Sequence, residues 1–189
     1  MDIVLTSTLL VAIAEIGDKT QLLAILLAAK FRKPVPVILG ILVATLANHA
    51  IAAFAGSELA GFFEGKAFRY AVAVSFLAMA AWALIPDKYE ESAEKPSRFG
   101  PFLTTLIAFF FVEIGDKTQV ATVALGARFH DVTLVTIGTT LGMMLANVPA
   151  VFLGERATKV LPLNIVRIIA ALIFLGLGVW VLAETAGWL

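Results

Sequence analysis

The chain has 189 residues, of which 60% are hydrophobic and 15% charged, and its 14 Lys and Arg residues balance its 14 Asp and Glu residues. Soluble globular domains contain about 45–50% apolar and about 25% charged residues, so this composition excludes a soluble domain and indicates a protein surrounded by lipid. The balanced charge lacks the basic excess of a nucleic-acid-binding protein. The absence of cysteine excludes disulfides, thiolate metal sites and cysteine nucleophiles.

The apolar stretches predict an all-α integral membrane protein. The hydrocarbon core of a bilayer is about 30 Å thick, and roughly 20 apolar residues in a helix cross it. Six stretches qualify, and we expect six transmembrane helices at residues 3–27, 35–55, 68–85, 102–125, 132–153 and 165–183. Between the third and the fourth lies a polar stretch whose charged residues and prolines indicate a solvated linker.

The two sides of this linker are copies of one another. The sequence EIGDKTQ occupies residues 15–21 and recurs at residues 113–119, and Gly40 recurs at the same spacing as Gly138. Because each copy holds three expected spans, the second copy enters the membrane from the opposite side. Such inverted-topology repeats are typical of secondary transporters. The predicted organisation is a first three-helix repeat, a linker and a second, inverted three-helix repeat, at residues 1–85, 86–100 and 101–189.

The positions of Lys and Arg predict the orientation in the membrane. Basic residues near span ends are enriched on the cytoplasmic side. Nine lie on the side of the linker, and three lie on the side of the chain termini. We therefore expect a cytoplasmic linker, with both termini outside the cytoplasm, in the periplasm or an equivalent compartment.

Each EIGDKTQ copy places two acids and a lysine in the middle of an apolar span. A charged residue at the membrane centre costs about 2.5–3.5 kcal/mol on insertion scales, so these groups are expected to face inward and meet partners. Helical spacing at i, i+3 and i, i+4 puts each set on one face. An inverted repeat then brings both sets together near the midplane. Four carboxylates and two lysines carry a net charge of −4 + 2 = −2, which one divalent cation or two protons would neutralise.

Oxygen donors dominate the residues around these charges. Carboxylate, amide and carbonyl oxygens suit hard ions such as Mn²⁺, Ca²⁺ and Mg²⁺. Gly17 and Gly115 could allow a kink, as in the discontinuous helices of transporters. We expect His49, the one histidine inside a span, to be a packing or lumen residue rather than a ligand. The expected primary ligands are Glu15, Asp18, Glu113 and Asp116, with Asn48, Asn147, Gln21 and Gln119 as candidate helpers and Lys19, Lys117, Thr20 and Thr118 in support.

Other interpretations of the same residues stay open. The Glu–Lys pairs of the motif could be intrahelical ion pairs that hold the bundle together, and Asn48 and Asn147 could form interhelical hydrogen bonds. An exporter of an organic solute such as an amino acid, or a divalent cation channel, is an alternative to a cation carrier. An enzyme is not expected, because His49 is the one deep histidine available for a Ser–His pair and the G-x-G-D signature of intramembrane aspartyl proteases is missing.

The pattern E-x-G-D-[KR]-[TS], present twice at residues 15–20 and 113–118, resembles the Gdt-type family of cation exchangers. The resemblance covers essentially the whole chain. It implies transport of Mn²⁺ or Ca²⁺ in exchange for protons, with the motif acids as ligands and without a cofactor other than the transported ion. The short chain looks like a bacterial member, for which Mn²⁺ export across the inner membrane is the more usual assignment. The expected partners are the lipid bilayer, the metal ion and protons, and a homodimer is left open.

Overall fold

The computed structural model describes residues 2–63, 65–85, 99–153 and 163–188, and within these ranges the chain forms helices and no strand. This confirms the all-α class. The predicted linker, residues 86–100, lies almost entirely outside the described residues. The helices are α1 (Ile3–Glu15), α2 (Lys19–Phe31), α3 (Pro34–Phe62), α4 (Lys66–Ala83), α5 (Pro101–Glu113), α6 (Lys117–Phe129), α7 (Val132–Leu153) and α9 (Leu163–Ala186).

The first and fourth expected spans are each broken into two helices. Helices α1 and α2 are separated at residues 16–18, and α5 and α6 at residues 114–116. The cause is local: Ile16 and Ile114 have extended backbone, and the next residues, Gly17 and Gly115, have φ of +80° and +77°. Positive φ is costly for residues with a Cβ and is readily adopted by glycine. The predicted kink is therefore a complete interruption of the helix.

Three helices of the described chain are long and apolar enough to cross a membrane by themselves: α3, α7 and residues Asn164–Ala186 of α9. Helices α1 and α5 are apolar but have 13 residues each, or about 20 Å of helix, which is less than the roughly 30 Å of a bilayer core. The lengths agree with a membrane protein. The arrangement of six spans in two inverted repeats stays a prediction.

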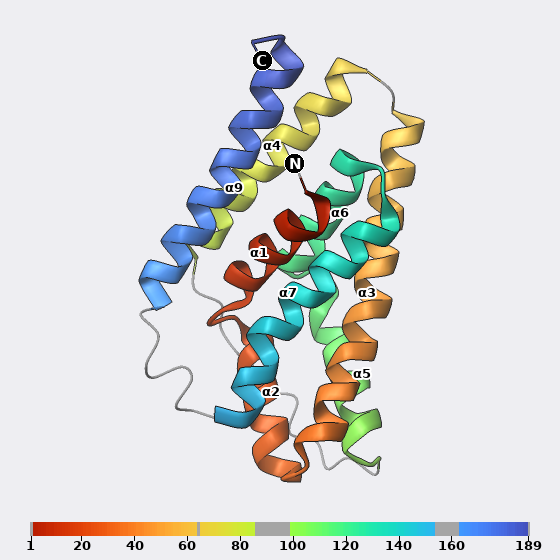
Figure 1. The fold of residues 1–189 in the computed structure, drawn as a ribbon, viewed down its shortest axis with the longest axis vertical. Helices are drawn as coiled ribbons and strands as arrows, with labels where there is room; N and C mark the ends of the chain where they lie inside the picture. Colours follow the sequence, from red (N-terminus) through yellow and green to blue (C-terminus); the bar gives the residue numbers. More distant parts are fainter. Residues whose placement is uncertain (1, 64, 86–98, 154–162, 189) are drawn as a thin grey trace.

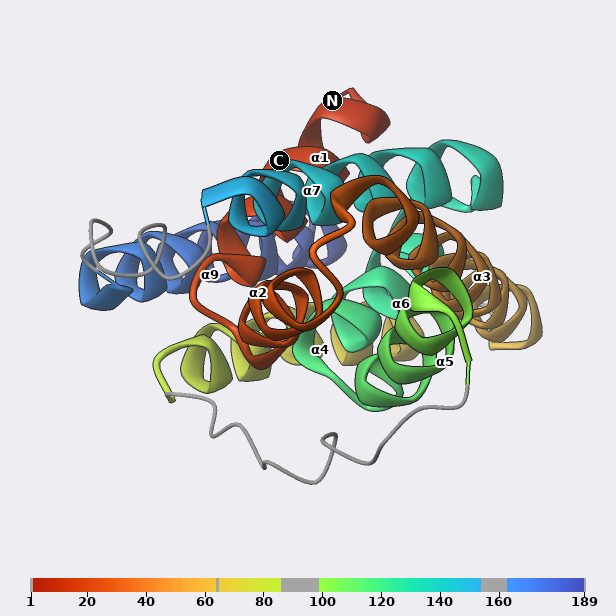
Figure 2. The same ribbon diagram turned by 90° about the horizontal axis from the view of Figure 1, so that it is seen from below.

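The helices of the two halves run in opposite directions. In Figure 1, α3 runs from the bottom of the view to the top and α7 runs downward, while α4 descends and α9 rises beside it. Both chain ends lie in the upper part of this view. Helix α1 packs against α7, as its counterpart α5 packs against α3, and α4 packs against α9. Seen from below in Figure 2, α6 lies near the middle of the bundle, in contact with α1, α3, α4 and α7.

Close helix contacts depend on glycines at equivalent positions of the two halves. A Cβ on Gly40 of α3 would lie 2.7 Å from the Thr105 Cβ of α5, and one on Gly138 of α7 would lie 2.7 Å from the Ser7 Cβ of α1. A Cβ on Gly142 would lie 2.5 Å from a backbone oxygen of α1. Glycine at these positions therefore lets the helix backbones approach closely, as small residues do in membrane proteins.

The polarity of the molecule is inverted relative to a soluble protein. Large apolar side chains such as Phe62 and Phe111 are 80% and 67% exposed, whereas Glu15 and Asp116 are 0% and 2% exposed. Apolar side chains form a large buried cluster, which includes Phe76 and Phe174, its counterpart in the second half. An apolar exterior around buried charges is the arrangement expected when lipid is the solvent.

Candidate metal centre

Both EIGDKTQ motifs lie at the helix breaks, which determine where their acids point. Glu15 is the last residue of α1, and Asp18 is the N-cap residue of α2. Glu113 and Asp116 repeat this arrangement at the break between α5 and α6. The spacing of i, i+3 and i, i+4 assumed a continuous helix. That assumption was wrong, because the two acids of each motif belong to different helices.

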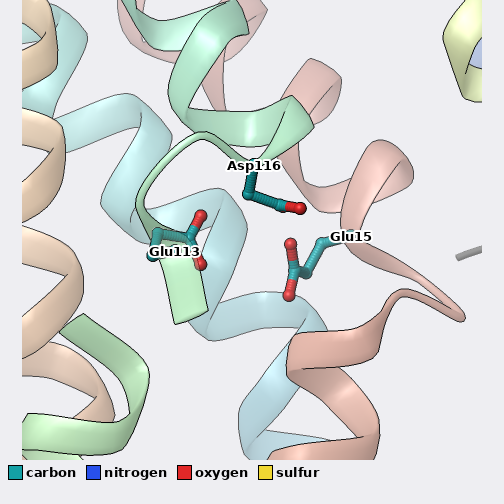
Figure 3. Close-up of side chains that lie close together, drawn as sticks. All are labelled: Glu15, Glu113 and Asp116. Atoms are coloured by element: carbon teal, nitrogen blue, oxygen red, sulfur yellow. The ribbon is translucent and has the colours of Figure 1, made fainter. Parts of the chain in front are cut away.

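Three of the four acids form one cluster, which we call the carboxylate triad: Glu15, Glu113 and Asp116. Each offers a carboxylate oxygen within 4.8 Å of the others, and all three side chains are buried. Figure 3 shows the three carboxyl groups facing one another from the two broken helix pairs. The triad therefore joins the two halves of the chain at a point where like charges crowd together, and a cation is the natural partner for such a cluster.

Asp18 is buried but does not belong to this triad. Its side chain is 3% exposed and makes no cap hydrogen bond to α2. It lines a small cavity together with Lys117, Arg167 and Gly17. The sequence predicted four convergent carboxylates, and the structure brings three of them together.

Hydroxyl and amide groups orient the glutamates of the triad. The Thr20 hydroxyl donates to Oε1 of Glu15, and the Thr118 hydroxyl makes the same bond to Oε1 of Glu113. The Asn147 amide nitrogen donates to Oε1 of Glu15 over 3.1 Å. Each glutamate is thus held by the threonine of its own motif, five residues further along the chain.

The two glutamines of the motifs support the broken backbone. The side-chain oxygen of Gln21 accepts the N–H of Gly17 at 2.9 Å, and that of Gln119 accepts the N–H of Gly115 at 2.6 Å. The Gln21 amide also donates to the carbonyl of Ala146 over 3.1 Å. The side-chain oxygens of the two glutamines are therefore already bonded to the N–H groups of the break glycines, which have no partner within a helix.

Asn48 lies beside the second break, and its hydrogen bonds join it to groups outside the triad. Its amide nitrogen donates to the carbonyl of Phe110 over 2.9 Å, and its oxygen accepts from Gln119 over 3.5 Å. Asn147, its counterpart, instead contacts Glu15. The interhelical hydrogen bonds considered from sequence are therefore present, and the two asparagines are not equivalent.

The ion pair of the site crosses between the halves of the chain. The ammonium of Lys19 lies 2.8 Å from Oδ1 of Asp116, and Lys19 is 27% exposed while Asp116 is 2% exposed. Lys117 is buried and donates to the carbonyl of Ile85 over 3.0 Å. The intrahelical Glu–Lys pair considered from sequence is thus replaced, for Lys19, by a pair with the other motif.

Several buried acceptors at the site have no hydrogen-bond partner among the described residues. They include Oε2 of Glu15, Oε2 of Glu113 and Oδ1 of Asn147. Buried polar atoms in native proteins are nearly always satisfied, so this concentration needs an explanation. Hard cations are coordinated by oxygen atoms, so three buried oxygens without hydrogen-bond donors around the triad fit the ligands of such an ion.

His49 also lies at the site, where from sequence we expected a packing or lumen residue rather than a ligand. It is 0% exposed, and its Nε2 lies 3.7 Å from Oε1 of Glu113. The signal that could have identified it is its position next to Asn48, inside an apolar helix where a polar side chain needs a reason.

An apolar exterior, antiparallel helix pairs and buried acids at two helix breaks define a membrane transporter for cations. The comparison with protein families agrees. The model of the family "Divalent cation/proton antiporter GDT1" matches residues 3–91 and 101–188, and the chain belongs to this family. Each of the two matched segments contains one copy of the EIGDKTQ motif.

The chain is also similar to a curated protein of Vibrio cholerae serotype O1 that is named "Putative manganese exporter". The two are 50% identical over 176 residues, which cover 93% of this chain and 88% of that protein. No solved structure gives a significant match. The family and this relative point to a transporter as the class of protein.

Proposed function

We propose that this protein is a secondary active transporter that exports Mn²⁺ in exchange for protons, with Ca²⁺ as the second candidate cargo. The observation that carries the proposal is the carboxylate triad, whose oxygens approach within 4.8 Å in a buried site. The family description supports divalent cation and proton exchange. The name of the Vibrio cholerae relative supports manganese as the cargo.

The charge of the site matches a divalent ion. The triad contributes −3 and the paired Lys19 contributes +1, so these four groups sum to −2. One divalent cation neutralises this charge, and so do two protons, which makes the two cargoes mutually exclusive occupants. Moving an uncompensated charge through a low-dielectric interior is costly. If the protein therefore changes conformation only when either the metal ion or the two protons neutralise the site, transport exchanges metal for protons.

We assign the three triad acids as ligands in the conformation described here, and Asp18 as the ligand that replaces Asp116 in the opposite conformation. Inverted repeats allow this exchange, because each half can adopt the conformation of the other. Asp18 and Asp116 are equivalent N-cap residues, and neither side chain caps its own helix. Gln21, Gln119 and Asn48 then position the backbone, while Asn147 holds Glu15 and offers its unpartnered oxygen to the ion.

The proposed architecture has six membrane crossings, with α1–α2 and α5–α6 each crossing as a broken pair. The opposite directions of α3 and α7, and of α4 and α9, support the inversion. We place the protein in a bacterial inner membrane, with residues 86–100 cytoplasmic and both termini periplasmic. Mn²⁺ would enter from the cytoplasm, and protons taken up outside would return the empty carrier.

Transport in proteoliposomes tests this proposal. Vesicles containing the purified protein and a pH-sensitive dye are exposed separately to Mn²⁺, Ca²⁺, Mg²⁺ and Zn²⁺, and metal uptake and internal pH are recorded together. We expect Mn²⁺ to move opposite to protons, with weaker apparent Mn²⁺ affinity at lower pH. Mn²⁺ flux that is indifferent to pH and to a proton gradient would indicate a channel or a uniporter. Flux of amino acids without metal flux would indicate the organic-solute exporter.

A further inference from the structure

We propose that His49 is a nitrogen ligand of the transported ion and gives the site its preference for first-row transition-metal ions over Ca²⁺ and Mg²⁺. This inference rests on the proposed function, since it concerns the cargo of the same site. It assigns a ligand that neither the motif nor the family comparison identifies, because His49 lies on α3, outside both EIGDKTQ segments.

The first observation is an unsatisfied imidazole at the triad. His49 is 0% exposed, and neither Nδ1 nor Nε2 has a hydrogen-bond partner among the residues that the structure describes. Leaving a polar group buried without a partner costs about 1–3 kcal/mol. A packing residue would not need to bear that cost, whereas a metal ligand recovers it when the ion binds.

The distance to the triad is compatible with a shared ion. Nε2 of His49 lies 3.7 Å from Oε1 of Glu113, which is too long for a good hydrogen bond. Metal–ligand bonds of about 2.0–2.6 Å place two ligands of one ion roughly 3–5 Å apart. The imidazole and the carboxylate therefore stand at the separation of two ligands with an ion between them.

The duplication supplies an internal comparison. The pair Asn48–His49 of the first half aligns with Asn147–Val148 of the second. Around Glu15 the amide of Asn147 supplies a hydrogen-bond donor at 3.1 Å, whereas beside Glu113 the Nε2 of His49 lies 3.7 Å from Oε1. Since the other half packs a valine at the equivalent position, the fold does not require a histidine there.

The chemical consequence is selectivity. A site made of carboxylate and carbonyl oxygens alone suits Ca²⁺, Mg²⁺ and Mn²⁺ alike, whereas an added imidazole nitrogen favours first-row transition metals. One nitrogen among oxygen ligands raises the affinity for Mn²⁺ while adding little for Ca²⁺. His49 would thereby let the carrier remove a transition metal in the presence of more abundant alkaline-earth ions.

Metal binding to the purified full chain in detergent tests the assignment. Dissociation constants for Mn²⁺ and Ca²⁺ are measured for the wild type, for His49→Gln and for the control His130→Gln, which changes the histidine at the C-cap of α6. We expect His49→Gln to lower the preference for Mn²⁺ over Ca²⁺ by about tenfold or more, the size of effect that changes near a metal site produce. The control should keep the wild-type preference. Because the comparison uses the ratio of the Mn²⁺ and Ca²⁺ dissociation constants of one sample, it does not depend on how much of that sample is folded.

Pulsed electron paramagnetic resonance of bound Mn²⁺ gives a second, independent readout. A directly bound imidazole produces a nitrogen hyperfine coupling, which should be present in the wild type and in His130→Gln and lost in His49→Gln. Bound Mn²⁺ without nitrogen coupling, or an unchanged metal preference in His49→Gln, would overturn the role of His49. Failure of the wild type to bind any divalent ion would instead overturn the proposed function.

Discussion

At the scale of single residues, the polar groups near the helix breaks divide into those that face the ion and those that hold the backbone. Each glutamate of the triad accepts a hydrogen bond from a threonine hydroxyl. Each motif glutamine accepts a hydrogen bond from the N–H of a break glycine. The two aspartates differ: Asp116 belongs to the triad and binds Lys19, whereas Asp18 lines a small cavity with Lys117 and Arg167.

The two aspartates are therefore predicted to differ in their effects. Asp116→Asn removes one of three carboxylates and leaves Lys19 without its partner, so the dissociation constant for Mn²⁺ should rise by more than about tenfold. Asp18→Asn should retain most of this affinity in the conformation described here, yet abolish transport, because the opposite conformation loses its ligand. Equilibrium binding in detergent and flux in proteoliposomes separate the two effects. Equal binding defects in both variants would refute the proposed exchange of ligands.

At the scale of elements, the two helix breaks are the features that create the site. They place the last residue of one helix and the N-cap of the next at the same point in the bundle. The helix ends bring backbone groups without intrahelical partners, and the partial charges of the helix dipoles, close to the site, as in other transporters with discontinuous helices. Both break glycines have positive φ, and at Gly115, where an added Cβ would meet nothing within 4 Å, glycine is required by its φ rather than by lack of space.

Gly115→Ala tests this requirement. An added Cβ would meet nothing within 4 Å, but the residue has φ of +77°, and alanine in that conformation costs about 1–2 kcal/mol. We expect a lower unfolding temperature in detergent and weaker Mn²⁺ binding. The matched control is Gly61→Ala in α3, which is also unobstructed but helical, and should leave both quantities unchanged. Equal behaviour of the two variants would contradict a conformational role for Gly115.

The contact between α3 and α6 is a second feature at this scale. A Cβ on Gly126 would lie 2.3 Å from the Ala53 carbonyl oxygen, and one on Gly56 would lie 2.0 Å from the Val123 carbonyl oxygen. Gly126→Ala should therefore push the helices apart and destabilise the protein by about 1–3 kcal/mol. Gly176→Ala in α9, where an added Cβ meets nothing within 4 Å, is the control. A thermal unfolding series in detergent that ranks the two variants equally would show that the contact is not tight.

At the scale of the whole molecule, the repeated motif, the apolar exterior and the opposed helix directions support the proposed architecture of two inverted repeats. Apolar side chains cover the outside and charges lie inside, and the helix directions of the two halves oppose one another (Figure 1). The loops that follow α2 and α6 are equivalent in the two repeats and should therefore lie on opposite sides of the membrane.

Cysteine labelling tests this arrangement without background, because the chain has no cysteine. Lys33→Cys lies in the loop after α2, and Asp131→Cys in the loop after α6. In intact bacterial cells an impermeant maleimide should label position 131 and leave position 33 unlabelled until the cells are permeabilised. Labelling of both positions from outside would refute the inversion. Labelling of position 33 alone would preserve the inversion and reverse the orientation.

The sequence by itself determined the class of protein and the repetition of the motif, and it predicted the chemistry of the site. Composition is sufficient for the first, because a chain this apolar has no surface for water. Two identical motifs within apolar spans are sufficient for the others, because buried charge needs a compensating partner. The glycine in each motif also pointed to the interruption of the helix, though not to its completeness.

Only the tertiary structure decided which groups meet. Glu15, Glu113 and Asp116 form the triad, Lys19 pairs with the other motif, and His49 approaches Glu113. Sequence periodicity could not predict these contacts, because it describes neighbours along one continuous helix, and both motif helices are broken at their acids. Partners separated by about half the chain meet only when the two repeats pack, and that packing depends on backbone approach at glycines far from the motifs.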